Sequence, residues 1–202
     1  MIVLITGLKQ SGKSTFATEL ENYGFKHMQF SAKLKKISET LIQELFDDLL
    51  IIGRSLYYAE NHKFICKVDW DIEQFKEMII PSKHNVNKLT FRQFLQYFGT
   101  DFVRKYIDKD YWVHNLYYHI TNNDNVVVSD VRFFNEIAPN GNHKIVVVGI
   151  DRGYDVRNDS HASEIEIGAI IKNKADIVID SDLPLYDYQQ KCRKIIEERI
   201  LK

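Results

Sequence analysis

The sequence predicts an α/β fold with a doubly wound parallel sheet of five strands. An unbroken apolar run at residues 1–6, and runs rich in valine and isoleucine at 126–130 and 144–150, are typical of strands that are covered on both faces of such a sheet. Amphipathic helical segments alternate with these runs. Directly after the first run, residues 7–14 match G-x-x-x-x-G-K-[ST], the pattern of a phosphate-binding loop. Together these observations favour the fold of the P-loop NTPases.

The loop at residues 7–15 predicts a site for the phosphates of a nucleoside triphosphate, with Mg2+. Gly7 and Gly12 let the backbone approach the phosphates closely, because neither carries a Cβ atom. The free N–H groups at the start of the next helix attract anions. Lys13 adds a charge for the outer phosphates, and the Ser14 hydroxyl is suited to ligate Mg2+. The residues of the loop that are expected to bind the nucleotide are Lys9, Ser11, Gly12, Lys13, Ser14 and Thr15.

The remaining elements are predicted from local patterns. Short strands are expected at 25–30 and 175–180, which bring the sheet to five. Gly99 is expected to end one helix and Thr100 to begin another. In the least regular region, 51–90, we expect a short helix at 72–79, a loop at 81–88 and no separate core. The helices are otherwise expected at 15–20, 32–50, 90–98, 100–106, 110–120 and 185–202.

Bulk composition limits the partners of the chain. The net charge of the 202 residues is −1, so no overall field favours nucleic acid or an anionic membrane, and we expect neither as a partner. The apolar start is too short for a signal peptide or a membrane span. Cys66 and Cys192 lie far apart in sequence, which favours reduced thiols in a cytoplasmic protein and leaves a disulfide between them open.

A second group of candidate site residues follows the strand at 126–130. Asp130 ends that strand, and Arg132 and Glu136 come directly after it, at the sheet edge where parallel strands place ligands. The alternative is structural, with Asp130 capping a helix and Arg132 pairing with Glu136 on a helix surface. In the charged loop after the third run, Arg152 and Arg157 are candidates to cover phosphates, or else solvated charges.

Three functions are compatible with these motifs. The first is phosphoryl transfer to a small acceptor, which needs positive groups to offset the charge on donor and acceptor. The second is a motor or switch ATPase or GTPase that acts on a macromolecule. The third is a nucleotide-binding module without turnover. The balanced charge argues against a motor on nucleic acid.

Five blocks of sequence resemble the deoxynucleoside monophosphate kinases of bacteriophages, within the P-loop nucleoside monophosphate kinases. The blocks are GLKQSGKST at 7–15, FSAKLK at 30–35, FRQFLQYFGTDFVRKYIDKDYWV at 91–113, VVSDVRFFNE at 127–136 and NDSHASE at 158–164. The resemblance implies transfer of a phosphoryl group from ATP, with Mg2+, to a deoxynucleoside monophosphate (dNMP), giving the diphosphate. A phosphomevalonate-kinase-like enzyme and a non-kinase ATPase remain alternatives.

The resemblance also implies roles for individual residues. Lys13, Asp130 and Arg132 would be catalytic, and Ser14 and Asp130 would hold Mg2+, although many members have Asp where this chain has Ser14. Arg152 and Arg157 would belong to a lid at about 151–164, anchored by His161 and Glu164. Arg92 and Arg132 would clamp the acceptor phosphate, and Trp112 would lie against the nucleoside. The full expected acceptor set is Leu34, Lys35, Arg92, Gly99, Thr100, Trp112, Asp130, Arg132 and Glu136.

We therefore expect a single domain over 1–202, with its core at 1–30 and 120–202 and a helical acceptor-binding insertion at 31–119. The resemblance also suggests a viral origin and action in the host cytoplasm. Whether the chain forms a homodimer is left open by the sequence.

Overall fold

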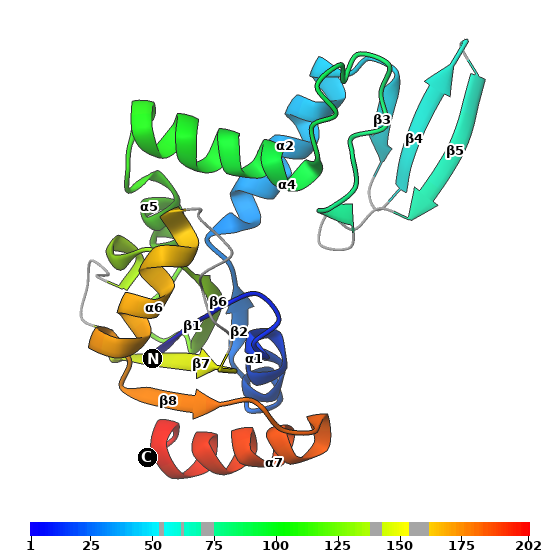
Figure 1. Cartoon of the computed structure of the whole chain (residues 1–202). Coiled ribbons are helices and arrows are strands. Elements are labelled where there is room, and N and C mark those ends of the chain that lie inside the picture. The colour runs from blue at the N-terminus through cyan, green and yellow to red at the C-terminus, as the bar shows by residue number, and fades with distance from the viewer. Residues whose placement is uncertain (53–54, 62, 70–74, 138–142, 154–161) are drawn as a thin grey trace. The chain divides into compact units, whose positions relative to one another are not determined.

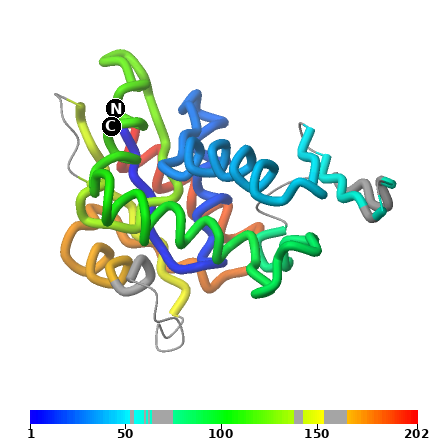
Figure 2. The backbone as a smooth tube through the Cα atoms, turned by 90° about the horizontal axis from the view of Figure 1, so that it is seen from above, coloured from blue at the N-terminus to red at the C-terminus, as the bar shows by residue number. Residues whose placement is uncertain are grey.

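The computed structural model describes residues 1–52, 55–61, 63–69, 75–137, 143–153 and 162–202. The chain divides into two compact units, one of residues 1–30 and 113–202 (unit 1) and one of residues 31–112 (unit 2). The chain enters unit 2 as helix α2 and returns through helix α5 (Figures 1 and 2). The sequence placed the first boundary at the same residue and the second a few residues later. That the whole chain acts as a single domain stays a prediction.

Unit 1 is built on a five-stranded sheet in the order β2-β6-β1-β7-β8, in which every pairing is parallel. The sheet predicted from the sequence is therefore confirmed. Its strands are β1 (Ile2–Gly7), β2 (Lys26–Met28), β6 (Val126–Val131), β7 (Ile145–Asp151) and β8 (Ile177–Asp180). Its helices are α1 (Lys13–Asn22), most of α5 (Tyr111–Tyr118), α6 (Ala162–Lys174) and α7 (Leu185–Ile195), which continues to Ile200.

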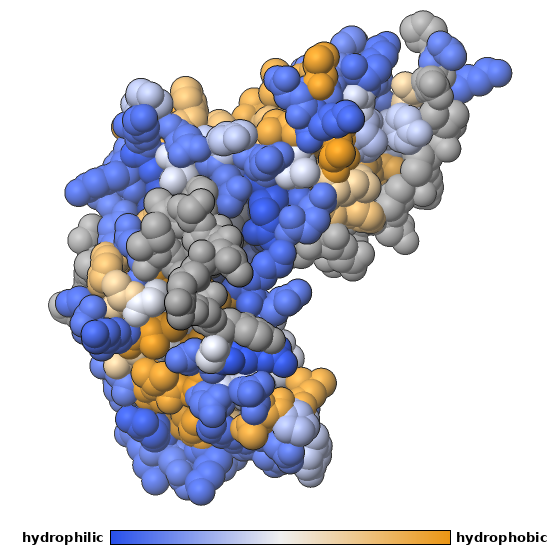
Figure 3. Space-filling model, viewed as in Figure 1, coloured by the Kyte–Doolittle hydropathy of each residue, from blue (hydrophilic) through white to orange (hydrophobic). Residues whose placement is uncertain are grey.

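Helices cover both faces of this sheet, as the unbroken apolar strands predicted. Val3 and Ile5 of β1 face one core, which contains side chains of α1 and α7. Ile2 and Leu4 face the other core, with side chains of α5 and α6. The predicted apolar face of the C-terminal helix is confirmed, since Tyr188, Cys192, Ile196 and Ile200 are buried and Ile195 is partly buried against the same core. β8 is an edge strand, and hydrophobic colour shows over its region on the face drawn in Figure 3.

Unit 2 contains α2 (Ser31–Leu45), an antiparallel sheet and the helix α4 (Phe91–Gln96). The sheet has the order β3-β4-β5, with β3 at Leu49–Ile52, β4 at Ser55–Glu60 and β5 at Lys63–Asp69. Side chains from α2, from the sheet and from α4 share one core, which includes Ile42, Leu56, Ile80 and Phe91. Leu56 and Ile80, from the region 51–90, therefore belong to a core that is shared with α2 and α4.

The structure of this region corrects two predictions. The helix expected at 32–50 ends at Leu45, and Leu49 lies in β3, where it pairs with Tyr58. The spacing of Leu45 and Leu49 suits a helix, but pairing with β4 buries Leu49 and leaves Leu45 exposed. The helix expected at 72–79 lies partly outside the described residues, and its last residue, Ile79, forms an isolated antiparallel bridge with Thr90.

The helix after Thr90 does not end at Gly99. Thr90 and Gln93 form a capping box at the start of α4, as the expected start implied, and a π-helical segment, Tyr97–Ile107, continues from α4 without a break. Gly99 and Thr100 thus lie inside one helix. The sequence placed Phe102, Val103 and Tyr106 on one side, but only Val103 is buried. The i→i+5 bonding of a π-helix changes which residues share a face.

Candidate functional site

The phosphate loop lies between β1 and α1, and two of its glycines occupy places that no other residue fits. A Cβ atom on Gly7 would lie 2.5 Å from the carbonyl oxygen of Ile150 and 2.5 Å from Oγ of Ser11. Gly12 has φ +94°, and a Cβ atom there would lie 2.9 Å from the ring of Tyr188. Gln10 also adopts a left-handed conformation, with φ 61°. The loop is therefore curled tightly, as a phosphate cradle requires.

Polar groups of the loop are available to an anion. Nζ of Lys13 donates hydrogen bonds to the carbonyl oxygens of Gly7, at 2.8 Å, and Leu8, so its charge lies across the loop. Oγ of Ser11 is buried and has no hydrogen-bond partner among the described residues. Because an unpaired buried hydroxyl is costly, a phosphate oxygen is a chemically suitable partner for it. Ser14, in the first turn of α1, is exposed.

The strand-end residues lie beside this loop. Thr6 of β1 is paired with Val131 of β6, and its Oγ1 donates a 3.0 Å hydrogen bond to the Val131 carbonyl. Asp130 and Arg132, on either side of Val131, are thus brought to the sheet edge that carries the loop. Oδ1 of Asp130 accepts a 2.9 Å hydrogen bond from the backbone N–H of Phe30, which ties the end of β6 to the chain after β2.

Glu136 braces the turn that follows β6. Its side chain is buried, and Oε2 accepts hydrogen bonds from the backbone N–H groups of Arg132, at 2.6 Å, and Phe133, at 3.1 Å. The carbonyl of Glu136 accepts one from the Tyr117 hydroxyl, whose pKa is raised above its usual value by burial and by the Glu136 charge. Among the residues described after β6, up to Ile137, the helical ones are Phe134–Ile137, which form a 3₁₀ turn. Arg132 and Glu136 therefore do not share a helix surface.

Arg152 is the only residue of the expected lid arginines that the structure describes. Its Nη1 donates a 3.1 Å hydrogen bond to the carbonyl of Gln10, and its Nε lies 4.0 Å from a carboxylate oxygen of Asp182. The guanidinium thus lies against the phosphate loop. Arg157 and His161 lie outside the described residues, as does the side chain of Glu164. The predicted lid is not tested.

Three expected acceptor residues of unit 2 pack together. Gly99 lies so close to Leu34 that a Cβ atom on Gly99 would be 2.5 Å from Cδ2 of Leu34. Trp112 is buried, and its Nε1 donates a 3.0 Å hydrogen bond to the Gly99 carbonyl. These contacts form a packing cluster in unit 2. The indole N–H of Trp112 is therefore committed to the backbone.

The other expected acceptor residues of unit 2 are half-buried polar side chains: Lys35, Arg92 and Thr100. Nε of Arg92 donates a 2.7 Å hydrogen bond to Glu77, with which it forms an ion pair. The backbone N–H of Arg92 donates to the carbonyl of Lys76 at 2.8 Å. The Arg92 guanidinium is held by a carboxylate. A phosphate group accepts hydrogen bonds from a guanidinium in a similar way.

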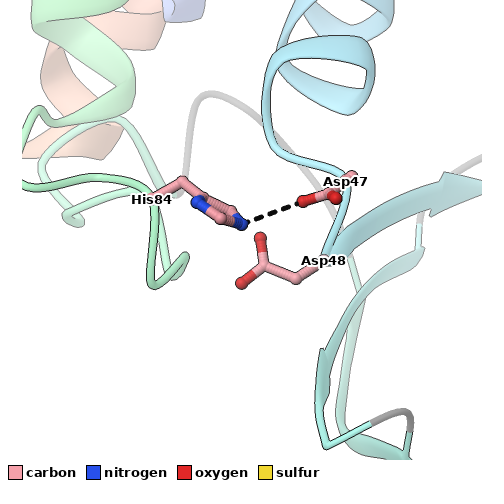
Figure 4. Close-up of side chains that lie close together, drawn as sticks. All are labelled: Asp47, Asp48 and His84. Carbon is pink, nitrogen blue, oxygen red and sulfur yellow. Dashed lines mark ion pairs between the residues drawn. The ribbon is translucent and has the colours of Figure 1, made fainter.

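A cluster of possible metal ligands lies elsewhere in unit 2. Atoms of Asp47, Asp48 and His84 lie within 4.8 Å of one another, and Nε2 of His84 is 3.1 Å from Asp47 (Figure 4). The Asp48 carboxylate already accepts hydrogen bonds from the Ser82 hydroxyl, at 2.6 Å, and from the Lys83 N–H, at 3.1 Å. An ion pair and a loop anchor account for this geometry, and we assign no metal to it.

Residues 173–176 match the N-K-x-D pattern with which switch GTPases read a base, so this chain does contain that pattern. The Asp176 carboxylate accepts a 2.7 Å hydrogen bond from the N–H of Val147. The Asn173 side chain donates to the Ala169 carbonyl within α6, at 2.9 Å. Asp176 thus ties the segment before β8 to β7, and Asn173 bonds within its own helix, which favours a structural role for both side chains.

No helix among the described residues has both the length and the apolar character that a membrane span requires.

Comparison with known proteins places the chain in a family context. A family model described as deoxynucleotide monophosphate kinase matches residues 37–192. A protein of Acanthamoeba polyphaga mimivirus named "Putative deoxynucleotide monophosphate kinase" is 29% identical over 214 residues, covering 98% of this chain and 96% of that protein. Among solved structures, a dephospho-CoA kinase from Campylobacter jejuni has 19% identity and a TM-score of 0.47, covering 98% of this chain and 96% of the other.

Proposed function

This chain belongs to the deoxynucleotide monophosphate kinase family, and on that premise we propose that it transfers the γ-phosphoryl group of ATP to a dNMP. In this proposal the reaction depends on Mg2+ and yields the deoxynucleoside diphosphate. The mimivirus relative supports a further proposal, that the protein is of viral origin and acts in the host cytoplasm.

The observation that carries the proposal is the convergence of charged groups at one edge of the unit 1 sheet. The phosphate loop follows β1, Asp130 and Arg132 flank the end of the neighbouring β6, and Arg152 follows β7 on the other side. Phosphoryl transfer needs charge stabilisation and alignment far more than covalent chemistry by the protein. A cradle between two strand ends that carry a carboxylate and guanidinium groups suits that need.

On the donor side, we assign the residues of the loop to ATP. The backbone of Lys9 to Thr15 surrounds the phosphates, and the Ser11 hydroxyl gains a partner there. Lys13 turns its ammonium from the Gly7 and Leu8 carbonyls to the transferring phosphoryl group. Arg152, held against the Gln10 carbonyl, adds a positive charge at the loop, and we assign Arg157 to the same side from the family resemblance.

We assign Ser14 and Asp130 to Mg2+. A hydroxyl and a carboxylate are the oxygen ligands that this ion prefers. The exposed hydroxyl of Ser14, next to Lys13, supports the assignment, as does the position of Asp130 one residue from the strand pair Thr6–Val131. When bound there, Mg2+ would neutralise part of the negative charge of the phosphates.

For the acceptor, we assign Asp130, Arg132 and Glu136 in unit 1. Glu136 holds the backbone at Arg132 and Phe133 through hydrogen bonds. In this proposal the Arg132 side chain, which extends from this fixed turn, binds the acceptor phosphate. Little proton transfer is required, because the acceptor phosphate is already an oxyanion. Within unit 2 we assign a second set to the acceptor, with Trp112 and Gly99 acting through the packing cluster described above. That set is Leu34, Lys35, Arg92, Gly99, Thr100 and Trp112.

The test is a panel of phosphorylated acceptors offered with Mg-ATP to the purified full chain. We expect turnover of at least one dNMP to its diphosphate, loss of turnover with EDTA, and its recovery with added Mg2+. The panel includes phosphorylated metabolites that are not nucleotides as controls. Turnover of only such a metabolite, or ATP hydrolysis without transfer to any acceptor, would refute the proposal.

A further inference from the structure

We propose that Tyr188, on the C-terminal helix α7, is a positioning residue that holds the phosphate loop in its nucleotide-binding shape through Gly12. This inference rests on the function proposed above, since it concerns the same loop. It assigns a part in nucleotide binding to a helix that carries none of the phosphate-binding residues.

Tyr188 contacts Gly12 in two ways. The ring lies so close to the glycine that a Cβ atom there would be 2.9 Å from Cε1 and 3.1 Å from Cζ. The hydroxyl of Tyr188 also donates a 3.3 Å hydrogen bond to the Gly12 carbonyl. That carbonyl accepts a hydrogen bond from the Phe16 N–H, at 3.1 Å, in the first turn of α1. The ring therefore leaves no room for a Cβ atom on the residue that precedes Lys13, and the hydroxyl contacts the carbonyl of that residue.

Gly12 is the point at which the loop becomes a helix. Its φ of +94° directs the chain into α1, and the peptide group between Gly12 and Lys13 supplies an N–H to the loop. A contact that limits rotation of this peptide pre-aligns the N–H groups for an anion. Pre-alignment lowers the ordering cost of binding and raises the affinity for the triphosphate.

The position of Tyr188 is itself fixed. The side chain is 3% exposed, within the core that contains residues of both α1 and α7. Its backbone N–H donates to the Pro184 carbonyl at 3.0 Å. Further along the same two helices, Arg193 donates to the buried Glu19 carboxylate at 2.8 Å. Burial raises the pKa of Tyr188 above its usual value, so the hydroxyl stays a neutral donor.

The alternative is that Tyr188 only fills the core, and Tyr23 provides a matched control. The Tyr23 hydroxyl donates a 2.7 Å hydrogen bond to Glu197, which also joins the end of α1 to the C-terminal helix. This bond lies at the opposite end of α1 from Gly12. Tyr23→Phe and Tyr188→Phe thus each delete one hydroxyl that connects the same two helices, but only Tyr188 touches the loop.

The experiment measures the Kd for Mg-ATP by calorimetry, the KM for ATP and for the dNMP, and the melting temperature. We expect Tyr188→Phe to raise the Kd and KM for ATP by about three- to tenfold, the range of one lost hydrogen bond, and to leave the dNMP KM unchanged. Tyr188→Leu, which also removes the ring, should raise them further. Tyr23→Phe should leave the ATP Kd within about twofold of wild type.

The inference is overturned if both Tyr188 variants lower the melting temperature yet bind Mg-ATP like wild type. It is also overturned if Tyr23→Phe weakens ATP binding as much as Tyr188→Phe. Failure of the proposed function is distinguishable from failure of this inference. If only the function fails, wild type binds Mg-ATP without phosphorylating a dNMP, and the Kd comparison still decides the role of Tyr188. Wild type that binds no ATP would refute both.

Discussion

Lys13 is the residue of the phosphate loop whose substitution we expect to affect phosphoryl transfer most. Its ammonium already lies across the loop, at the Gly7 and Leu8 carbonyls. We expect Lys13→Ala to lower kcat for phosphoryl transfer by about a hundredfold or more, since it removes a charge that offsets the developing charge on the transferring group. The measurement is steady-state kinetics with Mg-ATP and the preferred dNMP.

The fold should survive that substitution, because the Lys13 side chain belongs to neither core of unit 1. The melting temperature of the Lys13→Ala variant should stay within about 2 °C of the wild-type value. Lys26→Ala is the matched control, since Lys26 is exposed at the start of β2. A Lys13→Ala enzyme with near-normal kcat would contradict the assignment of the loop.

Substitution of Arg132 distinguishes the acceptor-binding site from the ATP-binding site. Its backbone is held by Glu136, and its side chain follows the strand end beside the loop. We expect Arg132→Ala to raise the dNMP KM or to lower kcat by about tenfold or more, and to change the Kd for Mg-ATP much less. Kinetics at varied dNMP, together with calorimetry of ATP, measure both effects. Equal loss of ATP affinity would place Arg132 on the donor side instead.

At the scale of elements, substitution of two helical glycines by alanine should change stability in opposite directions. Gly99 lies in the helix formed by α4 and its π-helical continuation, against Leu34. Gly168 lies in α6, and a Cβ atom there would meet nothing within 4 Å. Alanine favours a helix over glycine by about 1 kcal/mol, whereas overpacking costs about 1–3 kcal/mol. The contact with Leu34 should therefore decide the effect at Gly99.

We expect Gly99→Ala to lower the free energy of unfolding by up to about 2 kcal/mol, and Gly168→Ala to raise it by about 0.5–1 kcal/mol. Urea unfolding followed by tryptophan fluorescence measures both. Equal stabilisation by the two substitutions would show that Leu34 moves aside freely, and the packing cluster around Gly99 would lose its support.

The C-terminal part of α2 shows how element boundaries depend on partners. Leu45 and Leu49 have helical spacing, yet the chain leaves the helix between them. Asp48 is buried there and accepts hydrogen bonds from Ser82 and Lys83, and β3 follows at once. These partners lie more than thirty residues away, so local sequence patterns carry no sign of them.

At the scale of the whole molecule, each unit contains a buried carboxylate whose pKa is depressed. In unit 1, hydrogen bonds from Arg193 hold the pKa of Glu19 below its usual value, although burial opposes them. In unit 2, burial raises the pKa of Asp48, but hydrogen bonds from Ser82 and the Lys83 N–H outweigh it and lower the pKa overall. Both groups therefore bind protons more weakly in the folded chain than in the unfolded one.

A depressed folded pKa contributes stability above the unfolded pKa, and this stability is lost as the pH falls through the folded value. The free energy of unfolding should thus decrease as the pH falls below about 4.5, the ordinary pKa of Glu19. We expect Glu19→Gln to weaken this dependence, measured by urea unfolding from pH 6 to about pH 3. Glu198→Gln, at an exposed residue of the C-terminal helix, should keep the wild-type profile. An unchanged slope for Glu19→Gln would contradict the assignment.

The candidate site was only partly visible in the sequence. The spacing of Gly7, Gly12 and Lys13 is local, so a motif could find it. The contact of Arg152 with Gln10 joins residues 142 positions apart, and that of Tyr188 with Gly12 joins residues 176 apart. Tyr188 was predicted as a core residue of its helix, which it is, but nothing in its spacing revealed the loop against its ring.

By itself the sequence determined the parallel sheet, its phosphate loop and the family, because strands buried on both faces are continuously apolar and a phosphate cradle needs glycines at set intervals. Only the tertiary structure decided that β3, β4 and β5 form an antiparallel sheet, that Gly99 lies inside a helix, and that Tyr188 rests on Gly12. Each of these outcomes depends on which distant segment covers a surface, and the order of residues within one segment does not contain that information.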